Sequence, residues 1–304
     1  MVPIKIKLDD SFFSEEVRNG YIVSAKMKKI WAVLLDLLNE FSNVCKKYNI
    51  EWYADAGTIL GAVRHGGFIP WDDDIDVMMS RKNYNKLCKI AEKEFHNPYF
   101  FQTEYSDVGS VRGHAQLRNS LTTGILANEE SLKLQINQGI FLDIFPIDNL
   151  PDNLHERNIF LNNVAKAKFK ANRIANLTTR YHKKNNSFRS VIKSVLHFLL
   201  GLVGKNELKA YRKYELLEQK YISVDTKEVA KLFCFPFKER RVWKREWFNG
   251  IVFLKFEMME IPVPTGYLDL LDKFYGNWHE FKIGTSTHGE VKFDPEKCYK
   301  EYIK

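Results

Sequence analysis

Four aspartates within five residues constrain the fold of this chain more than any other feature of its sequence. The stretch GGFIPWDDDIDVMM places Asp72, Asp73, Asp74 and Asp76 between apolar flanks, although the chain of 304 residues has a formal net charge of +8. Like charges at this spacing repel each other, and burial between apolar flanks adds to the cost. An exposed acidic turn is one explanation. The apolar residues on both sides favour the other, in which a positive partner holds the carboxylates.

Hydrophobic periodicity around the aspartates predicts interleaved helices and strands. Residues 25–47 have apolar residues at helical spacing, and AGTILGAVRHGG predicts a short helix that stops at Gly66 and Gly67. Residues 152–222 are mainly helical in pattern. Further helices are expected at 81–95 and 267–275, strands at 51–55, 74–79, 99–103, 114–118, 139–145 and near 228–235, and a loop at 261–266. Because strands and helices interleave in the first half and helices dominate the second, we expect an α+β (mixed α/β) fold.

Positive charge is concentrated in one segment of the chain. Between Val164 and Lys220 there are 14 Lys and Arg against 3 Asp and Glu, a local balance of +11, whereas the remainder is near −3. The aspartate cluster lies outside this segment. The composition, 45% hydrophobic and 14% aromatic, is that of a globular protein rather than a disordered one.

The cysteines and the first residues predict a cytoplasmic protein. Cys45, Cys88, Cys234 and Cys298 are far apart and form no C-x-x-C pair, which suits reduced thiols better than a zinc knuckle. The start, MVPIKIKLDDSFFSEEV, lacks the continuous apolar core of a signal peptide. We therefore expect an intracellular, soluble chain.

The alternation of a strand predicts which aspartates act together. Side chains alternate between the two faces of a strand, so Asp74 and Asp76 point the same way and Asp73 points to the other side. Carboxylates two residues apart, about 7 Å along a strand, can share one magnesium ion or flank two metals about 4 Å apart. Oxygen ligands of this kind suit Mg²⁺ or Mn²⁺ rather than zinc.

A third acid fits the same scheme. Asp143 lies in GIFLDIFPID, whose other members are almost all apolar or aromatic, and a lone buried carboxylate there would be costly. Hydrogen bonds from nearby backbone N–H groups are one way to satisfy it. A strand that brings it beside Asp74 and Asp76 is the other, and it would complete a three-carboxylate metal cage. Asp148 competes for this role but follows Pro146 and is more easily a turn residue.

The turn before the aspartates has the features of a phosphate site. Gly57 and Thr58 stand where a strand turns into a helix, and backbone N–H groups at a helix N-terminus bind anions. Thr58 either caps this helix or contacts phosphate. Arg64 and His65, just before the Gly-Gly break, are candidates for contacts with anionic oxygens, although Arg64 equally suits a surface salt bridge.

Three blocks of the sequence resemble the LicD family of phosphotransferases, whose fold is nucleotidyltransferase-like and which is related to the fukutin group. WYADAGTILGAVRHGGFIPWDDDIDVMM resembles its long signature, IFLDIFPIDNLP its second block and IPVPTGYLDLLDKFYGNW its third, over about residues 52–278. Within this resemblance Gly57 and Thr58 match the G-T turn, Asp74 and Asp76 the D-x-D, and Asp143 the third acid.

The resemblance implies a division of the chain into three parts. Residues 1–150 would form the nucleotidyltransferase-like catalytic core with its N-terminal helix. Residues 151–260 would form the mainly helical basic segment, and residues 261–304 a C-terminal segment that completes the core.

The resemblance also implies a reaction. A CDP-alcohol donor, CDP-choline above all, would place its pyrophosphate against the Gly57 turn and the divalent metals. A hydroxyl of a glycan precursor of lipopolysaccharide, teichoic acid or capsule would attack, with Asp143 or Asp74 as its base. Phosphoglycerol and phosphoribitol remain open as the transferred group.

Two other functions are consistent with parts of the sequence. A nucleotidyltransferase acting on a small molecule or nucleic acid would use the same carboxylates, but the basic segment has no recognisable RNA module and we expect no nucleic-acid partner. A non-catalytic choline- or glycan-binding protein would need an aromatic cage, for which the candidates are Trp52, Trp71, Phe141 and Trp278.

The basic segment predicts a peripheral contact with an anionic membrane at its cytoplasmic face. The apolar run Val195–Val203 is too short to span a bilayer, which needs about 20 apolar residues. Basic residues flank it, namely Arg189, Lys193, Lys205 and Lys209. A basic helix with a large apolar surface can lie among lipid headgroups. The resemblance supports such a contact, since acceptors of the family are often glycans assembled on lipid carriers at the cytoplasmic face. The alternative is a buried helix that packs on the core.

Overall fold

The computed structural model describes residues 2–130, 134–177, 192, 195–196, 199, 207–234, 239–283 and 289–303. Its centre is a seven-stranded sheet with the order β10-β9-β8-β4-β3, in which β6 also pairs with β8 and β5 with β6. The β4–β8 pair is parallel, and the other pairs of this sheet are antiparallel. The strands are β3 (Tyr53–Ala54), β4 (Asp76–Ser80), β5 (Tyr99–Gln102), β6 (Ala115–Asn119), β8 (Ile140–Leu150), β9 (Glu228–Ala230) and β10 (Val242–Lys244). The predicted α+β fold is confirmed.

Strand β8 organises the sheet because it pairs with three other strands. Residues 140–144 pair with β6, residues 143–147 with β4 and residues 148–150 with β9. Ten of its eleven residues are buried, which its apolar sequence IFLDIFPIDNL explains. The sequence therefore predicted this strand in the right place but ended it five residues too early.

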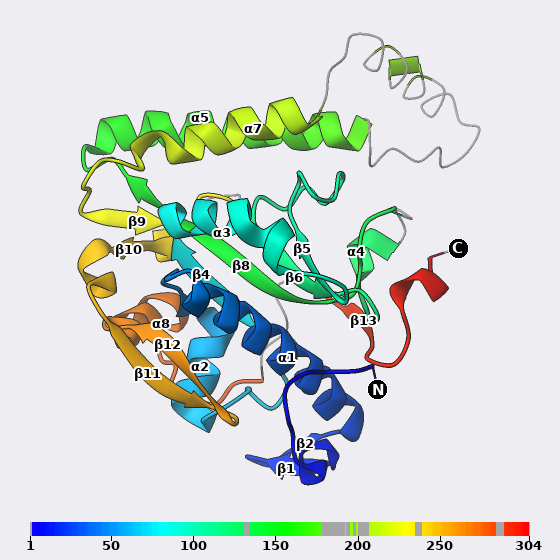
Figure 1. Ribbon diagram of the computed structural model, residues 1–304. Helices are drawn as coiled ribbons and strands as arrows, with labels where there is room; N and C mark the ends of the chain where they lie inside the picture. The colour runs from blue at the N-terminus through cyan, green and yellow to red at the C-terminus, as the bar shows by residue number, and fades with distance from the viewer. Residues whose placement is uncertain are drawn as a thin grey trace.

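Two helices cover one face of the sheet (Figure 1). Helix α1 (Ala25–Lys47) begins after Ser24, whose hydroxyl accepts a hydrogen bond from the N–H of Met27 at 3.2 Å, and it buries an apolar stripe that includes Trp31 and Phe41. Helix α3 (Arg81–Glu94) begins in the same way, with Ser80 accepting from Asn83 at 3.3 Å. Both helices confirm the predicted ranges within one residue.

The short helix α2 (Ala56–His65) links β3 to the aspartates. It ends at Gly66, which has a φ of 61° and so adopts the left-handed conformation that glycine tolerates best. Residues 66–75 then return along the helix to β4. This return places the aspartates beside the first turn of α2.

Helices α5 (Leu154–Leu177) and α7 (Glu207–Glu218) lie side by side and form a layer of their own, at the top of Figure 1. They bury Phe160, Val164, Tyr211 and Tyr214 in a second apolar cluster, which also includes Leu150 at the end of β8. The mainly helical pattern predicted for 152–222 is thus confirmed for the described residues.

The predicted loop at 261–266 is wrong. Strand β12 (Met259–Pro264) pairs with β11 (Ile251–Phe256) in an antiparallel hairpin. Pro262 and Pro264 suggested a loop, but a two-stranded hairpin has free edges at which proline is tolerated. Helix α8 (Tyr267–Tyr275) follows directly and ends at Gly276, as the sequence predicts.

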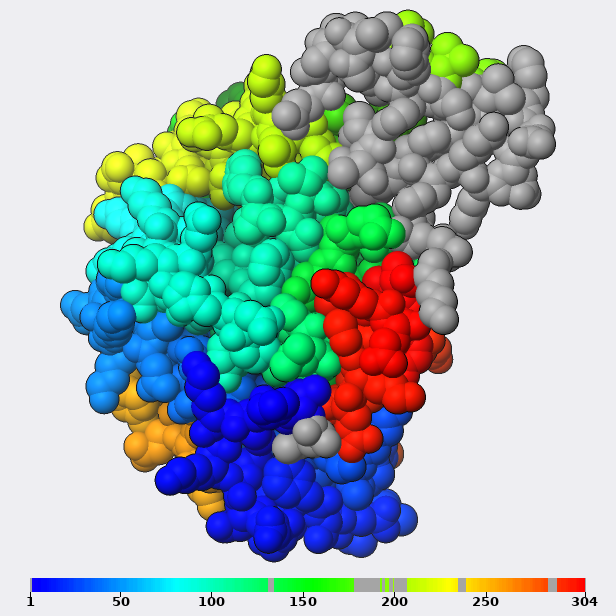
Figure 2. All heavy atoms as spheres, turned by 45° about the vertical axis from the view of Figure 1, so that its right-hand side comes forward, coloured from blue at the N-terminus to red at the C-terminus, as the bar shows by residue number. Residues whose placement is uncertain are grey.

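The two ends of the described chain lie against each other. The N–H of Val2 donates to the carbonyl of Pro295 at 3.3 Å, and Figure 2 shows the blue N-terminal and red C-terminal segments in contact. Strand β13 (Val291–Asp294) pairs with β7 (Thr123–Leu126), and β1 (Glu16–Arg18) pairs with β2 (Tyr21–Val23). The remaining short elements are α4 (Ala127–Glu130), η1 (Asp10–Phe13), η2 (Gln219–Tyr221), η3 (Glu239–Arg241), η4 (Arg245–Phe248) and η5 (Tyr299–Glu301).

The segment 151–260 is helical only in its first part. Strands β9 and β10 join the central sheet, and β11 pairs with β12. Residues of this range pack on both sides, since Val229 and Trp243 belong to the main core whereas Ala230 and Val242 belong to the cluster with α5 and α7. Among the described residues, none of the helices combines the length and the apolar character that a membrane crossing requires.

Candidate functional site

The parallel pairing of β4 with β8 brings two of the predicted acids together. Asp76, the first residue of β4, is the register partner of Asp143 in β8. Register partners on neighbouring strands lie about 5 Å apart and point to the same face of the sheet. The N–H of Asp143 also donates to the carbonyl of Ile75 at 3.1 Å. These contacts fix the two carboxylates side by side, although 67 positions separate them in the sequence.

The other three aspartates lie on the segment before β4. Because β4 begins only at Asp76, the strand alternation that separated Asp73 from Asp74 does not apply. Carboxylate oxygens of Asp72, Asp73 and Asp74 lie within 4.8 Å of one another. The prediction that Asp73 faces away from Asp74 is therefore wrong, and the reason is the later start of the strand.

Gly57 lies under one of these carboxylates. A Cβ atom at this position would be 2.8 Å from Oδ2 of Asp72, closer than non-bonded atoms approach. The carboxylate of Asp72 thus lies at the first turn of α2, where the helix dipole favours negative charge. The anion site predicted at Gly57 is shared with an aspartate of the cluster.

Thr58 neither caps α2 nor faces solvent. The residue before the helix is Asp55, and Thr58 is buried. Its hydroxyl oxygen accepts a hydrogen bond from the N–H of Asp76 at 2.9 Å. The capping role expected for Thr58 is wrong, because its side chain fastens the start of β4 to α2.

Arg64 and His65 lie at the opposite end of α2 from Gly57. Seven residues of helix separate Gly57 from Arg64, about 10 Å along the axis. The guanidinium of Arg64 packs on the ring of Phe281 at 3.9 Å, and Nδ1 of His65 is 3.1 Å from Oδ1 of Asn19. Burial, with Arg64 and Arg18 adding to it, lowers the pKa of His65 to about 4. The contacts described for both residues are away from the aspartates, so their phosphate role stays a prediction.

On its other side, Asp143 is held by residues of β6 and the loop before it. Oδ1 of Asp143 accepts a hydrogen bond from Nε2 of Gln116 at 2.7 Å and lies 3.0 Å from Nε2 of His114. Arg112 donates to Oε1 of Gln116 at 2.7 Å and forms a bidentate pair with Glu129, with both distances 2.8 Å. This chain of contacts fixes the orientation of the Asp143 carboxyl group.

The carboxylates differ in their affinity for protons. Burial, together with Asp74, Asp143 and Asp72, raises the pKa of Asp76 well above its usual value, and Arg241 opposes this. For Asp143 burial acts in the same upward direction, but the contacts with His114 and Gln116 outweigh it and hold the pKa below the usual range. Such a divergence between neighbouring acids is common at functional sites.

Basic and aromatic residues complete the surroundings of the cluster. Arg241 lies close enough to Asp76 for each to shift the pKa of the other, and burial is the larger cause for both. The aspartates also add to the effect of burial in raising the pKa of Tyr275. Arg241 belongs to η3 and Tyr275 to α8. Residues from the last third of the chain therefore lie beside aspartates from its first half.

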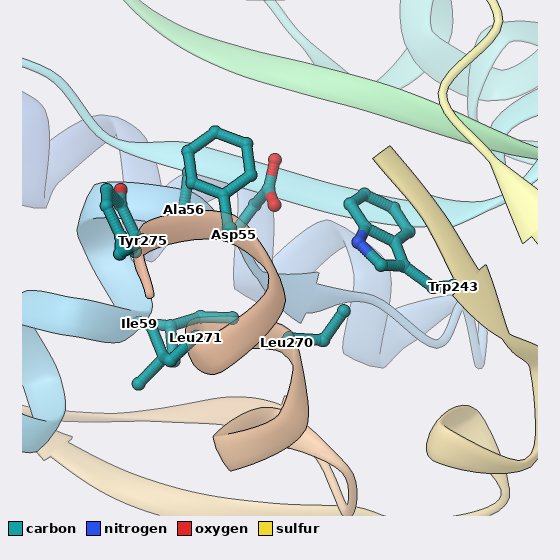
Figure 3. A pocket seen from close by; sticks show the side chains of 8 residues that line it. Asp55, Ala56, Ile59, Trp243, Leu270, Leu271 and Tyr275 are labelled. Carbon is teal, nitrogen blue, oxygen red and sulfur yellow. The ribbon is translucent and has the colours of Figure 1, made fainter. Parts of the chain in front are cut away.

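A buried ion pair is formed by Asp55, the residue that precedes α2. The ammonium of Lys231 contacts the carboxylate of Asp55, and both residues are buried. Lys231 also lies 4.3 Å from the ring centre of Phe145. Figure 3 shows Asp55 and Trp243 beside α8, whose Leu270 and Leu271 line a small cavity of about 10 Å³ there. This packing holds the N-terminus of α2 against α8.

The prediction that Asp148 is a turn residue is wrong. Asp148 lies within β8, is buried, and accepts two hydrogen bonds from Arg81, at 2.6 and 2.7 Å. Arg81 also donates to Glu218 of α7 at 3.0 Å. Burial is the main cause that raises the pKa of Glu218 to about 8. The contacts of Arg81 with Asp148 and Glu218 join α3, β8 and α7.

The four aromatic residues proposed for a choline cage contact different partners. Trp52 packs against Phe41, Trp71 against Tyr21 and Trp278 against His279, while Arg118 lies over the ring of Phe141. Trp52 and Trp278 are buried in the main apolar core, against which Trp71 packs, so packing accounts for these three side chains and the cage stays a prediction.

Sequence reasoning missed several residues around the cluster. His114 and Gln116 lie in HAQLR, where polar side chains alternate with apolar ones, and every residue of β6 is buried. A polar row on a buried strand was the available signal. Arg241 and Tyr275 gave none, since only the tertiary fold brings η3 and α8 to the aspartates.

The donor set suits a divalent metal such as magnesium. Three carboxylates lie within 4.8 Å of one another, and a further pair stands side by side on the adjacent strands. Burial first, and then the neighbouring carboxylates, raise the pKa of Asp76, so the site disfavours the charged form of this acid. Hard oxygen ligands and excess negative charge are what Mg²⁺ and Mn²⁺ require.

Comparison with known proteins adds an independent line of evidence. Residues 49–186 match the family model described as LicD/FKTN/FKRP, nucleotidyltransferase domain. The lipopolysaccharide cholinephosphotransferase LicD of Haemophilus influenzae is 27% identical over 254 residues, which cover 81% of this chain and 88% of that protein. The uncharacterized protein RP689 of Rickettsia prowazekii is 28% identical over 46% of this chain and 47% of its own length. The matched domain contains the α2 turn, all the clustered aspartates and Asp143.

Proposed function

We propose that this chain, whose residues 49–186 match the LicD/FKTN/FKRP nucleotidyltransferase domain, is a phosphotransferase of the LicD type that transfers phosphocholine from CDP-choline to a sugar hydroxyl of a cell-surface glycan precursor. Lipopolysaccharide, teichoic acid and capsule precursors are the acceptors considered, and phosphoglycerol or phosphoribitol transfer is the alternative. One observation carries the proposal. The parallel β4–β8 pair sets Asp76 beside Asp143, next to three more carboxylates and the first turn of α2.

In this proposal Asp74, Asp76 and Asp143 hold Mg²⁺ or Mn²⁺, and Asp72 and Asp73 join them. Bound metal would neutralise the phosphate oxygens and the charge that develops on the departing CMP. Arg241, close to Asp76, would pair with donor phosphate oxygens. The N–H groups at the first turn of α2, beside Gly57, would bind the donor pyrophosphate. Between Asp143 and Asp74, we choose Asp143 as the base that accepts the hydroxyl proton, because it lies between Asp76 of β4 and Gln116 of β6.

The direct test is CMP release from a panel of CDP-alcohols. We expect release from CDP-choline at a rate well above that from CDP-ethanolamine, CDP-glycerol and CDP-ribitol, and we expect EDTA to abolish it. A rate that is unchanged by EDTA, or equal for all four donors, would contradict the assignment of metal or of choline.

We further propose a peripheral contact with an anionic membrane. The sequence-based prediction relied on four basic residues. Three of them lie outside the described residues, namely Arg189, Lys193 and Lys205, and the fourth, Lys209, is exposed on α7. Helices α5 and α7 carry further exposed basic residues, namely Lys166, Lys170, Arg173, Arg212 and Lys213, and the exposed Lys220 follows in η2. Phe169 and Leu216 on the same helices are 66% and 62% exposed. Exposed apolar side chains among basic ones are typical of helices that lie on anionic lipid.

Vesicle co-sedimentation tests this contact. We expect binding to vesicles with 30% phosphatidylglycerol at low salt and its loss at 0.5 M NaCl, because each basic residue contributes about 1 kcal/mol near such a surface. Replacing Lys166, Lys170 and Lys213 with glutamine should weaken binding by at least about tenfold. The matched control replaces Lys26, Lys82 and Lys89, which are exposed on α1 and α3. Equal losses in both triple variants would show that the α5/α7 surface has no special role.

A further inference from the structure

An open cavity of about 340 Å³ adjoins the side of Asp143 that faces β6. Its walls come from the loop before β6, from β6, β7 and β8, and from α4. The side chains that carry chemistry there are Arg112, His114, Gln116, Asn128, Glu129 and Asp143. Its volume lies within the range of about 300–1,000 Å³ that is usual for small-molecule sites.

Asp143 separates this cavity from the aspartate cluster. On one side its register partner is Asp76, with Asp72, Asp74 and Arg241 nearby. On the other side Gln116 is its register partner and lines the cavity. In phosphoryl transfer the attacking and leaving oxygens lie in line on opposite sides of phosphorus. The acceptor must therefore approach phosphorus from the side opposite the departing CMP, and the cavity offers an approach on the side of Asp143 that faces Gln116.

The charges of the lining do not suit the donor's pyrophosphate. The described lining contains one arginine, Arg112, and its bidentate pair with Glu129 neutralises the charge of the guanidinium. Asp143 adds a negative charge. An anion would thus meet no net positive charge in this cavity, whereas at the cluster Arg241 and bound metal would receive it.

The polar groups of the lining suit a neutral, hydroxyl-rich ligand. The amides of Gln116 and Asn128 offer both donors and acceptors, as do the hydroxyl of Ser110 and the imidazole of His114. Phe141, Leu126 and Val111 supply apolar surface between them. A mixture of bifunctional polar groups and apolar surface matches a sugar ring, which presents hydroxyls at its edge and C–H groups on its faces.

We propose that this cavity is the acceptor subsite and that it takes an uncharged sugar ring, whose hydroxyl is presented to the Asp143 side of the cluster. The inference rests on the proposed function for the identity of the donor. The step breaks the P–O bond to CMP and forms a P–O bond to the sugar oxygen, and the hydroxyl proton passes to Asp143.

Asn128 offers a way to block the cavity without touching the cluster. It is exposed, lies on α4 and lines the cavity, so a larger side chain there can enter the cavity without burial in the core. The probes are CDP-choline as donor and the methyl glycosides of glucose, galactose, N-acetylglucosamine and N-acetylgalactosamine as acceptors, with the phosphocholine product followed by mass spectrometry. Asn128→Trp should raise the acceptor KM by at least about tenfold, and Asn128→Ala by a few-fold.

Donor affinity distinguishes the outcomes. We expect the Kd of CDP-choline, measured by calorimetry, to stay within twofold of wild type in both variants. The matched control Asn43→Trp, on the exposed surface of α1, should change neither constant. An unchanged acceptor KM in Asn128→Trp would overturn the subsite, and a Kd that rises with the KM would place the donor in the cavity instead. CMP release to water without transfer to any glycoside would contradict the uncharged sugar, whereas absence of CMP release would refute the proposed function itself.

Discussion

Replacing Asp76 with asparagine should lower phosphocholine transfer by about 10³-fold and at the same time raise the melting temperature of the metal-free protein. The two effects have one cause. Asp76 is half-buried among Asp72, Asp74 and Asp143, so its charge is useful only when metal and donor phosphates compensate it. Asparagine has nearly the same shape and removes one repelling charge from the crowded site.

The pH dependence of stability provides a second readout for this variant. The pKa of Asp76 is higher in the folded protein than its ordinary value of 3.8, so the folded state binds the proton more tightly than the unfolded state. Stability of the metal-free protein should therefore fall as the pH rises from about 4 through the folded-state pKa. Asp76→Asn should lack this part of the decline.

Thermal unfolding with and without Mg²⁺ measures both effects. The control is Asp9→Asn, an exposed aspartate near the N-terminus, which should change neither activity nor the response to Mg²⁺. If Asp76→Asn kept the full stabilisation by Mg²⁺, Asp76 would have no part in a metal site. If it melted well below wild type without metal, the account of repulsion among the carboxylates would be wrong.

Replacing Arg81 with methionine should destabilise the protein by about 3–5 kcal/mol. Arg81 is 3% exposed and is the cation that compensates Asp148, which is 1% exposed, so the variant leaves a buried carboxylate without its partner. The same substitution removes the hydrogen bond to Glu218 and so one link between α3 and α7. Urea denaturation gives the free energy of unfolding directly.

Two further variants separate the ion pair from general packing. Lys47→Met breaks the exposed pair with Glu94 and should have a much smaller effect. The triple variant Arg81→Met, Asp148→Leu, Glu218→Met should recover much of the loss, because apolar side chains can replace a buried ionic cluster. A loss of less than about 1 kcal/mol in Arg81→Met would mean that water reaches the cluster.

The sequence was sufficient for the helices and for the proximity of Asp76 and Asp143. Helices α1, α3 and α8 have strong periodicity with serine or glycine at their ends, so local physics sets their limits. Asp143 could be placed near the cluster because an isolated charge in IFLDIF would be unfavourable, and the β4–β8 register satisfies this requirement.

Other features depend on tertiary contacts that periodicity does not encode. The alternation of DIDVMM suggested a strand from Asp74, but the hydrogen bond from Asp76 to Thr58 and the pairing with β8 begin the strand at Asp76. The prolines of IPVPTG suggested a loop because its partner β11 was not recognised. Asp148 looked like a turn residue because its partner Arg81 is 67 residues away.

The most direct measurement of the proposed activity follows the two phosphorus atoms of CDP-choline separately. With donor labelled at the phosphorus next to choline, we expect the label in the glycan product and unlabelled CMP in solution. With donor labelled at the phosphorus next to cytidine, the label should appear only in CMP. The opposite distribution, with the cytidine-side phosphorus in the product and phosphocholine released, would show nucleotidyl transfer and contradict phosphocholine transfer at the Asp76–Asp143 site.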